Sequence, residues 1–504
     1  MMPQTSEQQY PLIAAIDLGS NSFHMVLART LGTEIRILER IGEKVQLGAG
    51  LDEDLLLDAA AMQRGFDCLR RFSQLIDGLP AAAVRVVATS TLRSARNRQV
   101  FIGQAQKILG HRIDVISGRE EARLIFLGIS HSLPSISGSR LAIDVGGGST
   151  EFIVGQGFES QYRGSLPIGC VRFSGQFMPG GAISTRAYHQ IYTATRLELL
   201  EIEQALQRFR WDEAVGASGT VKSIAQACQA AGLGDGGITM EGISLLKRQL
   251  LACRHVDDLH IEGVKPERIG IFPAGLAIVE AVFDALHLAS LRHVDGALRE
   301  GALYDLLGRH QHEDVRERSI LALMQRSHVD MEHSLLVEAR CHELLQQLAG
   351  EWQLEEEWHR DMLGWAARTH AVGLDIAHYH YHKHGAYLVE HSDLAGFSRQ
   401  EQQQLALLVR GHRRNIPLAE FAQHEEVKQQ LLYLCVILRL SILLHRIRSQ
   451  QPPRLQLRAG DNSLEVLFPP GWLESNPLTA AYFAKEAKWL LRINFTLGVG
   501  ESLL

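Results

Sequence analysis

The sequence predicts an α/β protein with two related domains that face each other, then a mostly helical region and a small β-containing tail. Two similar glycine-rich hairpins lie 127 residues apart, at Asp17 and at Asp144. Strand and helix patterns alternate around both hairpins. From about residue 312 the chain becomes helical and poor in glycine. We therefore expect domains at 1–133, 134–311, 312–452 and 453–504.

The second hairpin, at 141–152, reads Leu-Ala-Ile-Asp-Val-Gly-Gly-Gly-Ser-Thr-Glu-Phe. An apolar run, a glycine-rich turn and a further apolar run are typical of strand–turn–strand. Glycine tolerates positive φ and lets a ligand approach bare backbone, and successive N–H groups in a turn form an anion site. The anion-binding residues expected here are Gly146, Gly147, Gly148 and Ser149. Asp144 and Glu151 add carboxylates, which suit a hard divalent cation bound to phosphate.

The first hairpin, at 14–23, reads Ala-Ala-Ile-Asp-Leu-Gly-Ser-Asn-Ser-Phe. It repeats the Ile-Asp-aliphatic-Gly order of the second hairpin, and it places Ser20, Asn21 and Ser22 at the turn. A repeat of this length is too long for a solenoid. It predicts two homologous domains that each present a hairpin to a shared cleft, where ligands are commonly held.

The composition is that of a globular protein, with 46% hydrophobic and 21% charged residues among 504. A formal charge of −6 argues against general nucleic-acid binding, although a local basic channel stays compatible with it. The six cysteines form no CxxC pair, which favours free thiols in a reducing cytoplasm. We expect a soluble cytoplasmic protein and leave peripheral contact with the inner membrane face open.

The rest of the first domain is expected to contain strands at 34–41, 84–88 and 112–116 and helices within 51–79 and at 98–109. Arg93 follows the strand at 84–88, on the side where open α/β sheets bind ligands, so it is a candidate phosphate contact. Ser117 is a suitable N-cap for the next helix, and acids in the first turn favour the helix dipole. Glu120 and Glu121 therefore either both stabilise the helix dipole, or one of them lies at the cleft. The segment 133–138 is the expected crossover to the second domain.

In the second domain we expect a loop at 178–181, a long helix at 186–209 and a strand, turn and helix start over 215–225. The turn contains Ser218, Gly219 and Thr220, whose backbone donors suit a phosphate at a helix N-terminus; a purely structural turn is the alternative. Lys222 is a further candidate phosphate contact. The segment 295–304 ends in a helix that closes the two-domain unit.

Histidines concentrate in the C-terminal region, with a cluster at His378, His380, His382 and His384. A metal site needs ligands that converge on one point, and solvated helix surface is the alternative explanation. Two short strands are expected in the tail, at 455–458 and 464–468.

Together, the two hairpins, the Ser218–Thr220 turn, the segment 117–123 (Ser-Gly-Arg-Glu-Glu-Ala-Arg) and the segment 295–301 resemble the exopolyphosphatase / guanosine pentaphosphate phosphohydrolase family. The resemblance covers essentially the whole chain. It implies two actin-like (ribonuclease H-like) domains, followed by a helical domain similar to HD-type phosphohydrolases. It also implies a homodimer.

The resemblance assigns roles to the residues named above. Glu121 matches the family's catalytic glutamate, which positions or deprotonates the attacking water. Asp144 and Glu151 match the acidic residues of a Mg²⁺ site, and Arg93 matches a phosphate-contacting arginine. The phosphate-cradling positions are Ser20, Asn21, Ser22, Gly146, Gly147, Gly148, Ser149, Ser218, Gly219 and Thr220.

The implied activity is hydrolysis of terminal phosphate from inorganic polyphosphate, with removal of the 5′ γ-phosphate of guanosine pentaphosphate as the alternative. The glycine triplet and the segments 177–181, 295–296 and 408–414 resemble the exopolyphosphatase branch more. In the helical domain, His333 and His370 fall where metal ligands would lie, but Ala371 stands where an active HD domain has aspartate. We therefore expect this domain to do no chemistry of its own and to help build a polyanion channel and a dimer interface.

Overall fold

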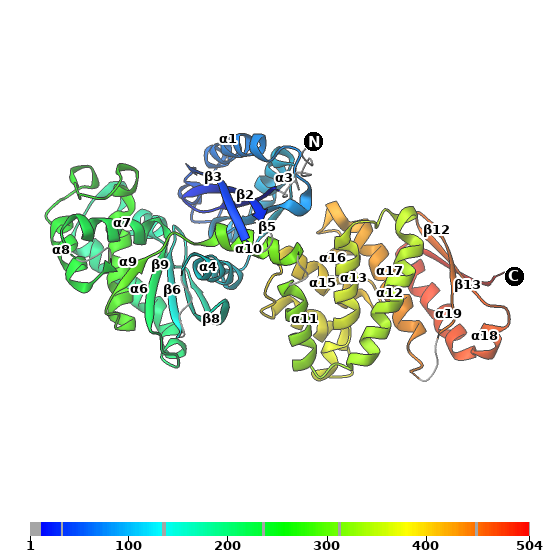
Figure 1. Ribbon diagram of the computed structural model, residues 1–504. Coiled ribbons are helices and arrows are strands. Elements are labelled where there is room, and N and C mark those ends of the chain that lie inside the picture. Colours follow the sequence, from blue (N-terminus) through cyan, green and yellow to red (C-terminus); the bar gives the residue numbers. More distant parts are fainter. Residues whose placement is uncertain are drawn as a thin grey trace, which may run out of the picture. The chain divides into compact units, whose positions relative to one another are not determined.

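The computed structural model describes residues 12–31, 34–133, 138–233, 237–310, 314–448 and 452–502. The chain forms two compact units, Met1–Val315 and Arg316–Leu504. The first unit contains two large sheets and their helices, and the second is mostly helical (Figure 1). The central part of the expected crossover, 134–137, lies outside the described residues.

The first lobe is a five-stranded sheet of order β3-β2-β1-β4-β5 between helices. β1 pairs antiparallel with β2 and parallel with β4. Alternate residues of β1 are buried on both faces: Ala14 and Ile16 pack with α1 and α3, whereas Ile13 and Ala15 pack with α10. The elements are β1 (Leu12–Leu18), β2 (Ser22–Leu31), β3 (Glu34–Lys44), α1 (Ala59–Ile76), β4 (Val84–Ala88), α2 (Ser90–Ser94), α3 (Arg98–Leu109), β5 (Ile113–Val115) and α4 (Gly118–Ser132).

The second lobe is a six-stranded sheet of order β10-β11-β9-β6-β7-β8. Its β8-β7-β6-β9-β11 run reproduces β3-β2-β1-β4-β5, so the repeated hairpin marks a repeated domain. The elements are β6 (Arg140–Val145), β7 (Thr150–Gln156), β8 (Glu159–Leu166), α5 (Cys170–Phe177), α6 (Thr185–Leu206), β9 (Glu213–Ala217), α7 (Ser218–Ala230), β10 (Gly237–Ile238), α8 (Met240–Leu251), α9 (Phe272–Leu286), β11 (Leu291–His293) and α10 (Leu298–His310).

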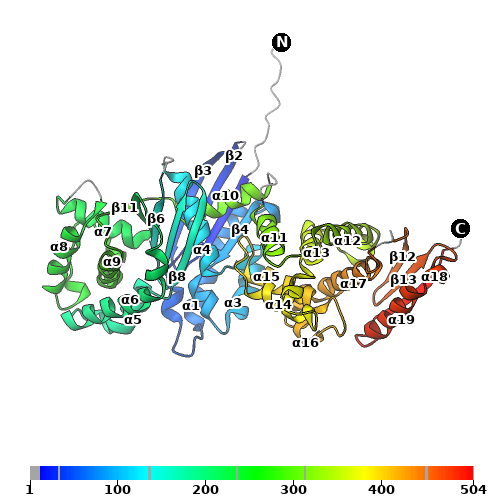
Figure 2. The same ribbon diagram turned by 90° about the horizontal axis from the view of Figure 1, so that it is seen from below.

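Helices α4 and α10 lie side by side and link the two lobes (Figures 1 and 2). α4 covers the face of the second sheet that carries Ala142 and Ile153, and α10 packs on the first sheet. Their backbones touch, because a Cβ added to Gly301 would lie 1.8 Å from the carbonyl oxygen of Leu124. Each lobe is therefore closed by a helix from the other half of the unit.

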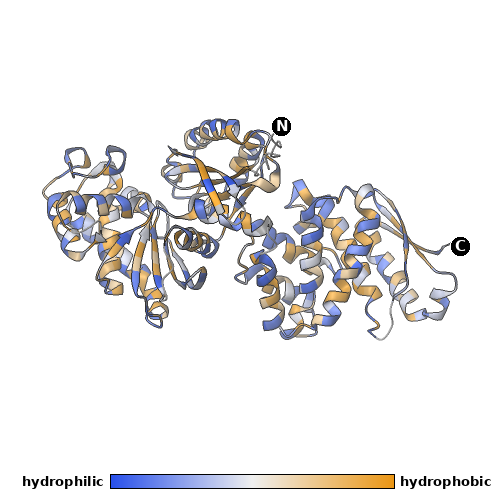
Figure 3. Ribbon diagram, in the orientation of Figure 1, coloured by the Kyte–Doolittle hydropathy of each residue, from blue (hydrophilic) through white to orange (hydrophobic). Residues whose placement is uncertain are grey.

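The second unit is a helical core with a small sheet of order β12-β13-β14. Figure 3 shows apolar segments along the strands of the large sheets and in the middle of this helical unit. The elements are α11 (Val315–Arg326), α12 (Met331–Trp352), α13 (Glu357–Thr369), α14 (Tyr381–His391), α15 (Arg399–Gly411), α16 (Leu418–Phe421), α17 (Lys428–Leu444), β12 (Gln456–Gly460), β13 (Ser463–Phe468), α18 (Trp472–Ser475), α19 (Pro477–Leu491) and β14 (Thr496–Glu501).

Two helical segments are long and apolar enough to cross a membrane, Pro266–Leu286 and Glu425–Leu444. In their most apolar windows, 72% and 61% of the residues are buried inside the protein. Both contribute to the hydrophobic cores, to which α9 supplies Leu276 and Phe283 and α17 supplies Leu434 and Ile437. Their apolar character is thus explained by core packing.

The predicted α/β class with a helical C-terminal region is confirmed, and most elements fall at the expected positions. The helix expected within 51–79 begins only at Ala59, where Asp58 accepts a hydrogen bond from the amide of Ala61 and caps it. In the tail, two expected strands are present, and a third, β14, pairs parallel with β13.

Candidate active site

The two hairpins occupy equivalent places in the two sheets. Asp17 lies near the end of β1, beside β4, and Asp144 lies near the end of β6, beside β9. In the β6–β7 hairpin, Asp144 is the register partner of Glu151. The fold thus places an aspartate at the carboxyl edge of each central strand, followed directly by a turn.

The glycine triplet is not explained by the backbone conformation expected for it. None of Gly146, Gly147 and Gly148 has positive φ, so the expected left-handed backbone is wrong. The residues are small because other groups lie close: a Cβ on Gly148 would lie 2.6 Å from Ser90 Oγ and 2.9 Å from Ser20 Oγ. The triplet lets the turn of the second lobe touch the turn of the first.

The turn at Ser218–Thr220 lies at the start of α7 and has a strained backbone. Ser218 adopts φ of 80°, a region that L-residues enter at a cost of about 1–3 kcal/mol and that clusters at functional sites. A Cβ on Gly219 would lie 1.8 Å from Arg268 Nη2, so this guanidinium rests on the turn. Backbone donors at a helix N-terminus and an arginine therefore meet at one place, as phosphate binding requires.

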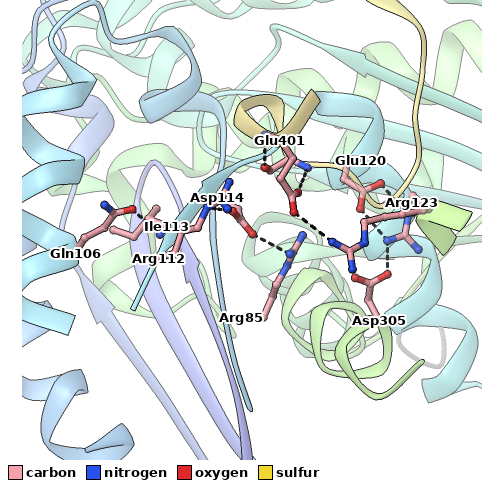
Figure 4. A network of polar contacts seen from close by, with 11 residues as sticks. Arg85, Gln106, Arg112, Ile113, Asp114, Glu120, Arg123, Asp305 and Glu401 are labelled. Atoms are coloured by element: carbon pink, nitrogen blue, oxygen red, sulfur yellow. Dashed lines mark hydrogen bonds and ion pairs between the residues drawn. The ribbon is translucent and has the colours of Figure 1, made fainter. Parts of the chain in front are cut away.

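The neighbouring acids of α4 have different environments. Ser117 caps the helix by accepting from the amide of Glu120, as expected. The Glu120 carboxylate binds Arg123 through two contacts of 2.8 Å, and Arg123 Nη2 also lies 2.5 Å from Asp305 Oδ1 (Figure 4). Glu121 Oε2 instead accepts from Arg93 Nη1 at 2.9 Å. Glu120 is thus part of the helix–helix interface.

These groups converge on one cavity of about 280 Å³ in the first unit. Every site residue named from the sequence lines it except Arg93, which reaches it through Glu121. The residues so brought together are Ser20, Asn21, Ser22, Glu121, Asp144, Gly146, Gly147, Gly148, Ser149, Glu151, Ser218, Gly219 and Thr220.

The carboxylates of this cavity hold their protons unusually strongly. Burial, together with the nearby Glu121, raises the pKa of Asp144 to about 7. Burial likewise raises the pKa of Asp17 to about 7 and that of Glu151 well above its usual range. Glu121 also has a raised pKa because it is buried, although Arg93 opposes the shift. Repulsion among buried carboxylates would be relieved by a bound cation.

The donor set fits a magnesium ion held jointly by protein and phosphate. Asp17 Oδ1 is buried and has no hydrogen-bond partner in the described structure. Among the described residues, no group of three or more His, Cys, Asp or Glu side chains is placed to hold a metal alone. Mg²⁺ typically takes one or two carboxylates and completes its shell with water and substrate phosphate. Asp144 and Glu151 suit that mode, with Asp17 close by as a further buried acid.

Sequence reasoning missed three groups that line the cavity. Asp17 is one of them, and its place in the repeated hairpin is the signal that marks it as the counterpart of Asp144. Arg268 and Arg299 are half-buried and line the cavity, and the charge of each opposes the rise in the pKa of Asp144. No local motif marked Arg268, which reaches the site from the short 3-10 helix Pro266–Ile271, just before α9. Lys222, an expected phosphate contact, lies 2.8 Å from Asp295 Oδ1.

The histidines of the helical unit do not form a metal centre within the described residues. The rings of His333 and His370 are 6.3 Å apart between centroids. His370 is buried and contacts the carbonyl of Ala367 through Nδ1 at 2.7 Å. The expected absence of chemistry in this unit stays a prediction.

Comparison with known proteins places both units in one family. Residues 26–310 match the Ppx/GppA phosphatase family, and residues 315–487 match domain III of Ppx/GppA phosphatases. A guanosine-5′-triphosphate,3′-diphosphate pyrophosphatase of Aeromonas hydrophila is 37% identical over 94% of this chain and 95% of its own length.

Among solved structures, an exopolyphosphatase from Cytophaga hutchinsonii matches 59% of this chain and 98% of its own, with 27% identity and a TM-score of 0.54. The Aquifex aeolicus Ppx/GppA family member matches 60% of this chain and 99% of its own, with 24% identity and a TM-score of 0.50. The second similarity concerns the fold alone. The chain belongs to the Ppx/GppA phosphatase family.

Proposed function

We propose that this protein is an exopolyphosphatase, which hydrolyses the terminal phosphate of inorganic polyphosphate and releases orthophosphate. The main support is the convergence of Glu121, a carboxylate cluster and three donor-rich turns on one cavity. Phosphoryl transfer depends mostly on positioning and on charge stabilisation of the equatorial oxygens. A cavity with this donor set suits a terminal phosphate better than it suits an apolar ligand.

In the proposed reaction, Glu121 holds the attacking water and accepts its proton. Arg93 orients the Glu121 carboxylate through the 2.9 Å contact between Nη1 and Oε2. Backbone N–H groups of the two hairpin turns and the Ser218–Thr220 turn would bind the phosphate oxygens, with Arg268 and Arg299 neutralising their charge. Mg²⁺ would be held by Asp144 and Glu151 and would supply further charge neutralisation.

Guanosine pentaphosphate is the second candidate substrate, because the Aeromonas hydrophila relative named for it is similar over nearly the whole chain. The same site could cleave its 5′ γ-phosphate, since both substrates end in a phosphoanhydride. Inorganic polyphosphate is preferred because the glycine triplet and the segment 408–414 resemble the exopolyphosphatase branch.

The test is phosphate release from long-chain polyphosphate, guanosine pentaphosphate and ATP, measured by malachite green at matched concentrations of terminal phosphate. The proposal expects the highest kcat/KM with polyphosphate and a requirement for Mg²⁺. A higher kcat/KM with guanosine pentaphosphate would assign the alternative. Binding of either ligand without phosphate release would overturn the proposed hydrolysis.

A further inference from the structure

The helical unit holds a second cavity, with a volume of about 960 Å³. Pockets for small organic ligands span roughly 300–1,000 Å³. The walls come from the start of α12, the residues around His370 and Tyr381, the turn at 412–414, the end of α17 and one face of α19. All these residues belong to the second compact unit, so the cavity shares no residue with the candidate active site.

The cavity carries surplus positive charge. Its charged residues, histidine aside, are six cations and three carboxylates: Arg413, Arg414, Arg439, Arg446, Arg448, Lys485, Asp330, Asp375 and Glu486.

Each carboxylate already has a partner in the cavity wall. Asp330 pairs with Arg448, Glu486 with Arg439, and Asp375 Oδ1 lies 2.9 Å from His328 Nδ1. Arg413, Arg414, Arg446 and Lys485 have no acidic partner among the described residues. In a chain whose formal charge is −6, this local surplus indicates a site for an anion.

The guanidinium groups are held in place by aromatic rings and by a buried clamp. Arg446 lies over Tyr482 at 4.2 Å and Arg413 over Tyr381 at 5.0 Å, measured to the ring centroids. Arg439 is 1% exposed and donates to the carbonyl of Arg414 at 2.8 Å. This bond supports the turn in which Arg414 has φ of 61°. Cations fixed in this way lose little entropy when they bind phosphate.

The same cavity also presents acceptors, which suit a ligand with several hydrogen-bond donors better than a bare phosphate chain. His370 and His412 are buried, and each places Nδ1 against a carbonyl, at 2.7 Å from Ala367 and 2.6 Å from Val409. Burial lowers the pKa of His370 to about 4, so the ring is neutral near pH 7 and its Nε2 is an acceptor. The internal groups of inorganic polyphosphate offer no donors at neutral pH, whereas a nucleoside has several hydroxyl and N–H donors.

We propose that this cavity is a binding site for a nucleoside phosphate, separate from the hydrolytic cleft. The phosphates contact the cations Arg413, Arg414, Arg446 and Lys485. The nucleoside donates to Nε2 of His370, because Nε2 of His412 already lies 3.3 Å from the Tyr381 hydroxyl. Its base stacks on the aromatic wall that includes Trp489. The cavity thus offers cations for the phosphates, an acceptor for the nucleoside donors and an aromatic surface for the base.

The experiment is calorimetric titration of the full chain with GDP, ADP and tripolyphosphate in EDTA, where magnesium-dependent turnover is absent. Loss of two cations in Arg413→Ala/Arg446→Ala should weaken nucleotide binding by about tenfold or more. Trp489→Leu should weaken nucleotides by about tenfold, because stacking is lost, and leave tripolyphosphate unchanged. Arg458→Ala, which removes an exposed arginine of β12 outside the cavity, is the matched control.

Arg268→Ala, which removes a cation of the hydrolytic cleft and leaves the second cavity intact, should bind GDP as the wild type does, which separates this site from the proposed hydrolysis. Circular dichroism verifies that each variant is folded. The proposal is overturned if neither nucleotide binds, if Trp489→Leu weakens tripolyphosphate as much as nucleotide, or if Arg458→Ala weakens binding as much as the double variant.

Discussion

Removal of the Arg123 side chain should strongly destabilise the first unit. Arg123 joins Glu120 and Asp305, and so ties α4 to α10 (Figure 4). The three side chains are 12%, 2% and 3% exposed. Deleting one partner of a buried ion pair typically costs about 3–5 kcal/mol, because charge remains in a poorly solvated place. Arg123→Ala should therefore lower the free energy of unfolding by about that amount.

Arg70→Ala is the matched control for this prediction. Arg70 also pairs with a carboxylate three residues before it, Asp67, at 2.5 Å, but the two side chains are 52% and 47% exposed. An exposed helix pair contributes only about 0.3–0.5 kcal/mol. Urea denaturation followed by circular dichroism measures both variants. Equal and small losses would refute the reasoning that burial makes the Arg123 network essential.

Three further predictions concern the cavity and the helical unit. Without metal, the free energy of unfolding should fall as pH rises from about 4 to about 7, because the pKa of Asp144 is higher in the folded state than in the unfolded state. Mg²⁺ should therefore raise Tm more at pH 8 than at pH 5.5. A Tm shift that does not depend on pH, measured by scanning fluorimetry, would contradict this. Gly148→Ala should lower the rate of phosphate release at least about tenfold, because the added Cβ displaces Ser20 Oγ. The control is Gly103→Ala, where the added Cβ meets open space, and it should keep normal phosphate release. His370→Ala should leave phosphate release within a few-fold of wild type; selective loss in a folded protein would show chemistry in the helical unit.

The sequence predicts the repeated lobes well, because their signals are local. An aspartate at the end of an apolar run, followed by a glycine-rich turn, is enough to place β1–β2 and β6–β7. The N-cap at Ser117 depends on neighbouring residues in the same way. These predictions agree with the structure because the geometry of a hairpin or of a helix cap depends on few long-range contacts.

What the sequence could not provide depends on distant contacts. The glycine triplet is required by Ser20 and Ser90, not by backbone angles, and only the packed lobes show this. Glu120 and Glu121 are adjacent and chemically alike, so their different roles follow only from their partners. These partners are Arg123 and Asp305 for Glu120, and Arg93 for Glu121. Without the family resemblance, the pattern alone left the pair undecided. Dimerisation and the cytoplasmic location stay predictions.

Glu121→Gln is the most direct test of the proposed hydrolysis. Glutamine keeps an oxygen that can accept from Arg93, and it keeps the size of the side chain, but it cannot take a proton from water. The variant should fold normally and bind polyphosphate, and its kcat should fall by about 10²–10⁴-fold. Phosphate release under saturating polyphosphate and Mg²⁺ measures this. Near-normal kcat would contradict the assignment of Glu121 as the catalytic base.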